Sequence, residues 1–173
     1  MWRSRLTLGG IALLLAVSMN GQQEPAELAG VWQMDAARSE SAHQAVPIGP
    51  VTLVIERNAS SVTIETRKGG RKSASTEKLT YFLDGSETST SAKNGVAVKA
   101  KARWNGTKLV TETARNIQGS TVTTMCVFSL DPGGHELTVD RSLTVQHGYQ
   151  FEGAATTGKA KDVFVRSKSA SRR

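Results

Sequence analysis

Arg141 is the residue whose position in the sequence most suggests chemistry. A strand is predicted over residues 135–145, and alternation puts on one face Leu137, Val139, Arg141, Leu143 and Val145. A guanidinium inside a core needs a carboxylate, a stacked ring or a ligand anion to offset its desolvation. Three interpretations are open: Arg141 anchors a ligand carboxylate, it stacks on Trp32, or a β-bulge near Asp140 turns it to solvent.

Two aromatic residues are further candidates for ligand binding. Tyr81 shares the apolar face of its predicted strand with Leu79 and Leu83, so its hydroxyl can face a cavity or reach a rim. Trp104 lies on the apolar face of a predicted hairpin. Cys126 alternates with apolar neighbours in another strand, which predicts a structural role for this thiol.

No arrangement of residues predicts catalysis, a metal or a cofactor. His43, His135 and His147 are far apart and lack metal-ligand spacing, and the sequence has no paired cysteines, phosphate-binding loop or nucleophile elbow. Without a nucleophile, base and orienting group, an enzyme is not expected.

The net charge of +7 lies mostly at the two ends of the chain. Arg3 and Arg5 belong to the N-terminal leader, and four basic residues lie between Arg166 and Arg173, which leaves the body near neutral. This distribution argues against a nucleic-acid groove. Residues 167–173 are predicted to be a basic flexible tail.

Residues 1–18 have the layout of a secretory signal peptide, with basic residues before an apolar stretch from Leu6 to Val17. Cleavage is expected after Ser18, with Gly21 as the alternative end point. The apolar stretch falls short of the roughly 20 residues of a spanning helix, so no membrane insertion is expected after cleavage. The product is predicted to be exported, to the periplasm or the medium, and its single cysteine allows no internal disulfide.

Residues 22–166 are predicted to form one all-β domain. About nine strands follow one another through short turns, and one helical turn is expected near Ala36 to Ser41. The region from His147 to Lys159 is glycine-rich, and a last strand is predicted over residues 161–166. A meander of this length favours closure into an antiparallel up-and-down barrel of about eight to ten strands, with a β-sandwich as the alternative.

The hairpin around Asn105-Gly106 gives the most detailed prediction. A two-residue turn at these positions pairs Trp104 with Thr107, Ala102 with Leu109, Ala100 with Thr111 and Val98 with Thr113, and puts Lys99 opposite Glu112. The inward face is rich in small residues. Such a wall either leaves a cavity or receives large side chains from the opposite wall.

Gly30-Val31-Trp32 has the G-x-W arrangement that opens lipocalins, and the run from Leu28 to Ser39 follows a signal peptide and precedes a meander. In these features the chain resembles the exported lipocalin-like (calycin-type) barrels of bacteria over nearly all of its mature length. The T-D-Y motif and the C-terminal helix of typical lipocalins have no counterpart here. The resemblance implies a barrel end plugged by Trp32 beneath a late arginine, for which Arg166 is the rival of Arg141, and an apolar ligand inside.

These observations predict an exported, non-enzymatic barrel that binds a small apolar or amphipathic ligand. The alternative is a protein-interaction module of the cell envelope, an inhibitor or assembly partner, with a filled core.

Overall fold

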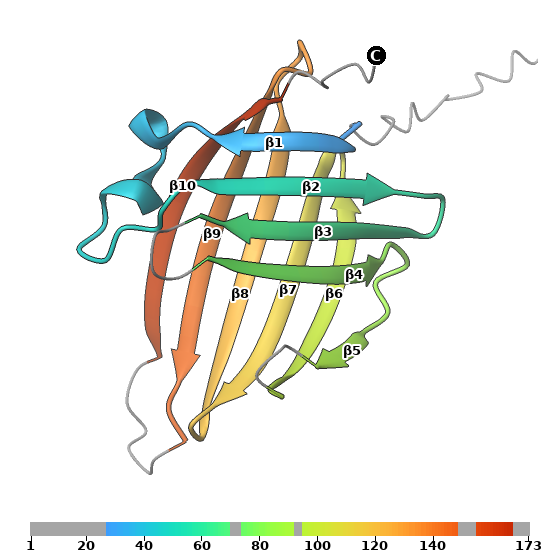
Figure 1. The fold of residues 1–173 in the computed structure, drawn as a ribbon. Coiled ribbons are helices and arrows are strands. Elements are labelled where there is room, and N and C mark those ends of the chain that lie inside the picture. The colour runs from blue at the N-terminus through green and yellow to red at the C-terminus, as the bar shows by residue number, and fades with distance from the viewer. Residues whose placement is uncertain (1–26, 70–73, 92–94, 149–154, 168–173) are drawn as a thin grey trace, which may run out of the picture.

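The computed structural model describes residues 27–69, 74–91, 95–148 and 155–167. Within them, ten strands form one antiparallel sheet that curls almost into a closed barrel (Figure 1). The strands are β1 (Gly30–Met34), β2 (Val51–Arg57), β3 (Ser61–Lys68), β4 (Ser75–Phe82), β5 (Thr88–Ser91), β6 (Ala97–Asn105), β7 (Lys108–Ile117), β8 (Ser120–Leu130), β9 (Glu136–Gln146) and β10 (Thr156–Arg166). The all-β barrel prediction is confirmed. The predicted leader and all of the tail except Ser167 lie outside the described residues.

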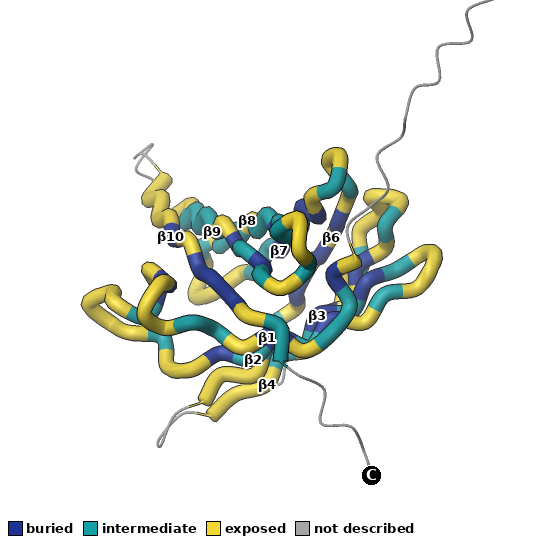
Figure 2. The backbone as a smooth tube through the Cα atoms, turned by 90° about the horizontal axis from the view of Figure 1, so that it is seen from above, coloured by how far each residue is buried: buried dark blue, intermediate teal, exposed yellow. Residues whose placement is uncertain are grey.

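Strands that follow one another in sequence pair, except β4 and β5, and β1 also pairs with β10, which gives the spatial order β4-β3-β2-β1-β10-β9-β8-β7-β6-β5. Strands β1 to β4 run crosswise in front of β6 to β10, so the two groups form opposite walls (Figure 1). Seen from above, buried positions alternate with exposed ones along strands such as β6 (Figure 2). The buried residues of β6, Val98, Ala100 and Ala102, belong to the hydrophobic core. The period of two in the sequence is therefore the physical cause of the barrel's apolar interior.

Strands β4 and β5 are the two edge strands of the sheet. In the described residues no backbone ladder pairs them, and side chains connect this side of the barrel instead. The Thr88 hydroxyl lies 3.0 Å from the Thr80 carbonyl oxygen on β4 and 3.1 Å from the Ala100 carbonyl oxygen on β6. Further along, Arg115 Nη2 on β7 lies 2.8 Å from Glu77 Oε2 on β4. These contacts hold the barrel nearly closed at its one unpaired seam.

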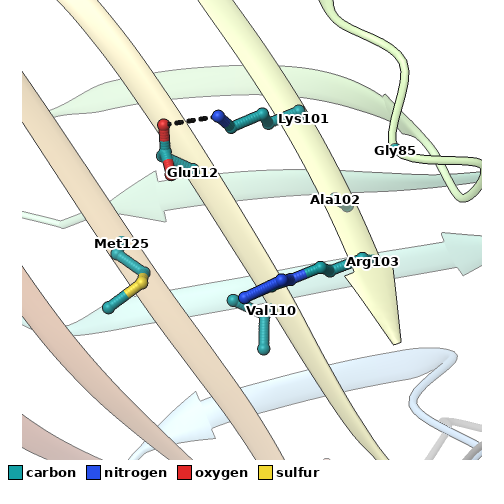
Figure 3. Close-up of a pocket in the computed structure, with 7 residues that line it drawn as sticks. All are labelled: Gly85, Lys101, Ala102, Arg103, Val110, Glu112 and Met125. Carbon is teal, nitrogen blue, oxygen red and sulfur yellow. Dashed lines mark ion pairs between the residues drawn. The ribbon is translucent and has the colours of Figure 1, made fainter. Parts of the chain in front are cut away.

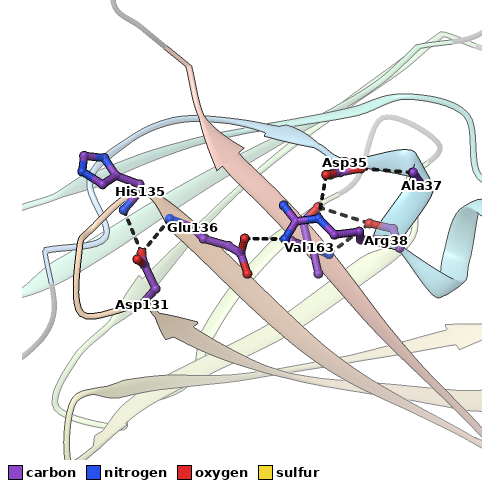
Figure 4. A network of polar contacts seen from close by, with 8 residues as sticks. Asp35, Ala37, Arg38, Asp131, His135, Glu136 and Val163 are labelled. Atoms are coloured by element: carbon purple, nitrogen blue, oxygen red, sulfur yellow. Dashed lines mark hydrogen bonds and ion pairs between the residues drawn. The ribbon is translucent and has the colours of Figure 1, made fainter.

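Two short 3₁₀ turns between β1 and β2, Ala36–Arg38 and Glu40–His43, pack on β10 where one helical turn was expected. The Ser39 hydroxyl lies 3.1 Å from the Val163 carbonyl oxygen and accepts from the Val163 backbone N–H at 3.0 Å. Arg38 bridges Asp35 and Glu136 at 2.7 and 2.6 Å (Figure 4). These contacts hold the segment between β1 and β2 against the part of β10 that is buried, from Ala160 onward.

The predicted register of the β6–β7 hairpin was wrong by two residues. Asn105 pairs with Lys108, so the turn residues are Gly106 and Thr107, and only Gly106 has a positive φ, +59°. This fits a turn that needs glycine at its first central position. The observed pairs are Trp104 with Leu109, Ala102 with Thr111, Ala100 with Thr113 and Lys101 with Glu112. Because a shift by two preserves the side-chain faces, the predicted inward face is retained.

Two other strand predictions need correction. Strand β5 was not predicted, since its sequence Thr-Ser-Thr-Ser has no apolar alternation and its four residues are held by pairing with β6. Strand β10 starts at Thr156 and not at residue 161, and Gly158 pairs within the β9 ladder opposite Leu143. In both cases a neighbouring strand supplies the partner that local sequence could not reveal.

Candidate functional site

Between its two walls the barrel has a partly open cavity of about 390 Å³. A volume of this size lies in the range of small-molecule sites. Its lining comes from seven strands and the loop before β2, and includes Ile48, Leu53, Ile64, Leu79, Tyr81, Thr111, Thr113, Thr124, Cys126, Phe128, Val139, Arg141, Leu143 and Phe164. Of the two interiors that the sequence allowed, filled or hollow, the structure has the hollow one.

Both walls carry apolar and polar side chains. The front wall contributes the buried residues Leu53, Ile64 and Leu79, and also the hydroxyl groups of Thr66 and Tyr81. On the back wall, cross-strand pairing aligns Thr111, Cys126 and Arg141 in one row, and Thr113, Thr124 and Leu143 in the next. A ligand in this cavity therefore meets apolar side chains on both walls, and hydroxyl, thiol and guanidinium groups in the rows of the back wall.

Arg141 lines the cavity, and its side chain is 29% exposed. The ladders to β8 and β10 run without interruption through Asp140 and Arg141, so the β-bulge, one of the three interpretations left open, is absent. Its Nη2 atom lies 3.4 Å from Oδ2 of Asp162, a carboxylate with no exposed surface. Ser41 donates to that carboxylate from its backbone N–H at 3.0 Å and from its hydroxyl at 2.7 Å.

Asp162 is a site residue that sequence reasoning missed. The sequence contained a signal for it. Asp162 and Phe164 are two residues apart in the last predicted strand, so their side chains lie on the same face, and Phe164 faces the interior. The shared face of β10 therefore brings a carboxylate beside the guanidinium of β9. A polar segment from outside the sheet, at Ser41, completes the group.

Tyr81 and Cys126 are both inside the barrel, and burial controls their ionisation. Desolvation raises the pKa of the Tyr81 hydroxyl, while its hydrogen bond with Thr111 has the opposite effect. Desolvation also raises the pKa of the Cys126 thiol, although the positive charge of Arg141 opposes the shift. Both groups are therefore neutral at physiological pH and offer uncharged hydrogen-bonding partners to a ligand.

One end of the cavity, which we call the mouth, is bounded by the exposed residues Lys68 and Ile117. The Arg115–Glu77 ion pair also lines this end. Arg141 lies four residues along the ladder from the mouth, since Arg141 pairs with Cys126 and Val145 pairs with Val122 opposite Arg115. The mouth and the Arg141 row are thus two separate polar zones.

Trp104 lies outside the lining of this cavity. Its ring is 5.1 Å from the guanidinium carbon of Arg57, and it borders a surface pocket together with Phe82 and Leu83. A smaller pocket of about 250 Å³ lies on the outer face of β6 to β8, where Arg103 and Val110 lie side by side below the Lys101–Glu112 ion pair (Figure 3). Arg141 and Tyr81 are brought together in the interior, and Trp104 is not.

Trp32 closes one end of the barrel and has no exposed surface. The guanidinium carbon of Arg166, not of Arg141, lies 4.2 Å from the centre of its ring. The indole N–H donates to the Leu28 carbonyl at 2.9 Å. Gly30, at φ +143°, allows this packing, because a Cβ there would lie 2.7 Å from Nη1 of Arg166.

Among the described residues, no group of three or more His, Cys, Asp or Glu side chains could hold a metal ion. All three histidines are exposed. In the same part of the chain, no helix has the length and apolar character needed to cross a membrane.

Comparison with known proteins identifies the fold. No protein-family model and no curated protein matches the chain. Among solved structures, a secretory abundant heat soluble protein from Ramazzottius varieornatus is 14% identical, with a TM-score of 0.55 over 84% of this chain and 99% of that one. Fatty-acid-binding protein 1 of Echinococcus granulosus is 12% identical, with a TM-score of 0.51 over 82% and 98%. The REP1-NXSQ fatty acid transporter is 16% identical, with a TM-score of 0.50 over 82% and 96%. These likenesses show the fold alone, an antiparallel β-barrel.

Proposed function

We propose that this protein is a non-enzymatic carrier or binder of a small apolar or amphipathic molecule, held in the cavity of the barrel. The observation that carries the proposal is a cavity of about 390 Å³ inside the barrel, lined largely by apolar side chains, into which the back wall presents Arg141. Burial of ligand surface against Leu53, Ile64 and Leu79 would supply affinity, and the polar row would fix orientation.

The solved structures of this fold support the proposal by their names. Two of them are a fatty acid transporter and a fatty-acid-binding protein, so the architecture accommodates apolar ligands elsewhere. The alternative of a protein-interaction module depended on a filled core, and the hollow interior favours the small ligand. No catalytic residue, metal or cofactor enters this proposal.

The proposed setting is outside the cytoplasm, in the periplasm or the medium. It rests on the leader pattern of residues 1–18. Edman or mass-spectrometric determination of the mature N-terminus would test it, with Met19 or Gln22 expected as the first residue.

The test of ligand binding is native mass spectrometry of mature protein purified from its natural source, with organic extraction of what co-purifies. We expect an adduct of a small molecule that is reduced or lost in Arg141→Ala. Arg103→Ala, on the outer face of β6, is the matched control and should retain the adduct. A clean apo mass, combined with no thermal shift from a panel of apolar ligands, would contradict the proposal.

A further inference from the structure

The carboxylate of Asp162 is a buried acceptor that lies against Arg141 of the cavity lining. Its three polar contacts are the Ser41 backbone N–H, the Ser41 hydroxyl and the guanidinium of Arg141. The N–H group and the guanidinium can only donate, and the serine hydroxyl is able to do so. Three donors therefore converge on a carboxylate that has no exposed surface.

This pairing leaves the inner part of the cavity without net charge. Arg141 and Asp162 neutralise each other, and Arg115 and Glu77 do the same nearer the mouth. The remaining charged residue of the lining, Lys68, is exposed at the mouth. A ligand carboxylate placed at Arg141 would lose its hydration and would also approach the buried Asp162 anion.

The other polar groups near Arg141 are uncharged. Thr111 and Cys126 share its row, and Thr113 and Thr124 form the next row towards the mouth. Tyr81, which also lines the cavity, is hydrogen-bonded with Thr111. Hydroxyl and thiol groups pair well with hydroxyl or carbonyl oxygens. The guanidinium has five N–H donors and meets Asp162 through Nη2, so it keeps donors for such an oxygen.

We propose that the ligand group received at Arg141 is an uncharged oxygen, a hydroxyl or a carbonyl, and not a carboxylate. The ligand class is then a neutral amphipathic molecule, such as a long-chain alcohol or ketone. This inference rests on the proposed function, since it names the ligand of the same cavity. Asp162 is the residue that sets the preference, because it cancels the charge of Arg141.

The experiment compares dodecanol, 2-dodecanone and dodecanoate, which share one chain length, as competitors of the uncharged fluorophore Nile red. They are measured on the unmodified mature protein and on Asp162→Asn, which retains an oxygen acceptor for Ser41 but removes the charge. The double variant Arg141→Met/Asp162→Asn removes both charges. Ser41→Ala is the matched control, because it loosens the same carboxylate without changing any charge.

We expect the unmodified protein to bind the alcohol and the ketone at least about tenfold more tightly than dodecanoate. Asp162→Asn should raise the affinity for dodecanoate at least about tenfold, the double variant should cancel that gain, and Ser41→Ala should leave the ratio unchanged. Dodecanoate binding that Lys68→Gln abolishes also supports the proposal, because the carboxylate is then held at the mouth.

The proposal is overturned if dodecanoate binds as tightly as dodecanol in both the unmodified protein and Lys68→Gln. It is also overturned if folded Asp162→Asn gains no affinity for dodecanoate. The unmodified protein and Lys68→Gln together decide the question even if Asp162→Asn does not fold. Failure of Nile red and of all three competitors to bind would instead contradict the proposed function itself.

Discussion

Replacing Arg166 tests whether one side chain holds the closed end of the barrel together. Its Nε donates to the Gly134 carbonyl at 2.8 Å, Nη1 to the Ala29 carbonyl at 2.8 Å, and Nη2 to the Glu27 carbonyl at 3.1 Å. The same guanidinium lies over the Trp32 ring. One residue of β10 thus joins the β8–β9 turn and the segment that leads into β1.

The expected cost of Arg166→Ala follows from these contacts. Hydrogen bonds to a charged group contribute about 1.5 to 3 kcal/mol each when buried, and a cation–π contact about 0.5 to 2 kcal/mol. Arg166 is only partly buried and its contacts are not additive, so we expect a loss of about 3 kcal/mol in the free energy of unfolding. Arg166→Lys keeps the charge but can reach one carbonyl at a time, and should recover about 1 kcal/mol of this.

The assay is urea denaturation followed by tryptophan fluorescence, with the slope of the transition compared between variants. A loss of about 3 kcal/mol corresponds to a decrease of roughly 6 to 12 °C in Tm for a domain of this size. Arg103→Ala removes an exposed arginine from the outer face of β6 and should change the stability by less than about 0.5 kcal/mol. Nile red binding by folded Arg166→Ala should be unchanged, because Arg166 does not line the cavity.

A cost below about 1 kcal/mol for Arg166→Ala would refute this reasoning. So would equal stability of Arg166→Lys and the unmodified protein, because a single ammonium group cannot satisfy three carbonyls. In either case the end of the barrel would be held by burial of Trp32 and not by the arginine above it.

Three further predictions concern titratable groups. Burial raises the pKa of the Cys126 thiol, so its alkylation by iodoacetamide at pH 8 should be at least about 100-fold slower in the folded protein than in urea. Backbone N–H groups of the turn at Asp131 donate to its carboxyl and lower the pKa of that group (Figure 4). The stability that this carboxylate contributes at neutral pH should therefore be lost as the pH falls through its lowered pKa. In a plot of the urea midpoint against pH, Asp131→Asn should flatten that part of the curve. Burial raises the pKa of Tyr81 above its ordinary value of 10, so its stabilising effect is full below pH 10 and is lost above it. In Tyr149→Phe, whose remaining tyrosine is Tyr81, the phenolate absorbance should appear only as the protein unfolds; a signal near pH 10 from folded protein would contradict this.

Much of the fold could be predicted because its determinants are local. Alternation identified nine of the ten strands, and the faces of β6 and β7 were predicted even though their register was displaced. The displacement arose at the turn. Asn105-Gly106 and Gly106-Thr107 are both acceptable two-residue turns locally, and they differ in which residues of β6 and β7 they pair. Strand β5 could not be found in this way, since it is a strand only because β6 offers it an edge.

The candidate site shows why side-chain partners are harder to predict than faces. The alternation of side chains along the strand indicated that Arg141 points inward. Three interpretations remained, because the register between β9 and β10 determines which side chain lies beside Arg141. Asp162 pairs opposite Val139, one row from Arg141, and only the full ladder from Thr156 to Val165 fixes that offset. Ser41 reaches the same carboxylate from the segment between β1 and β2, 121 residues away in sequence. The charge state of the cavity, and with it the kind of ligand that we propose, is therefore set by contacts that no single strand encodes.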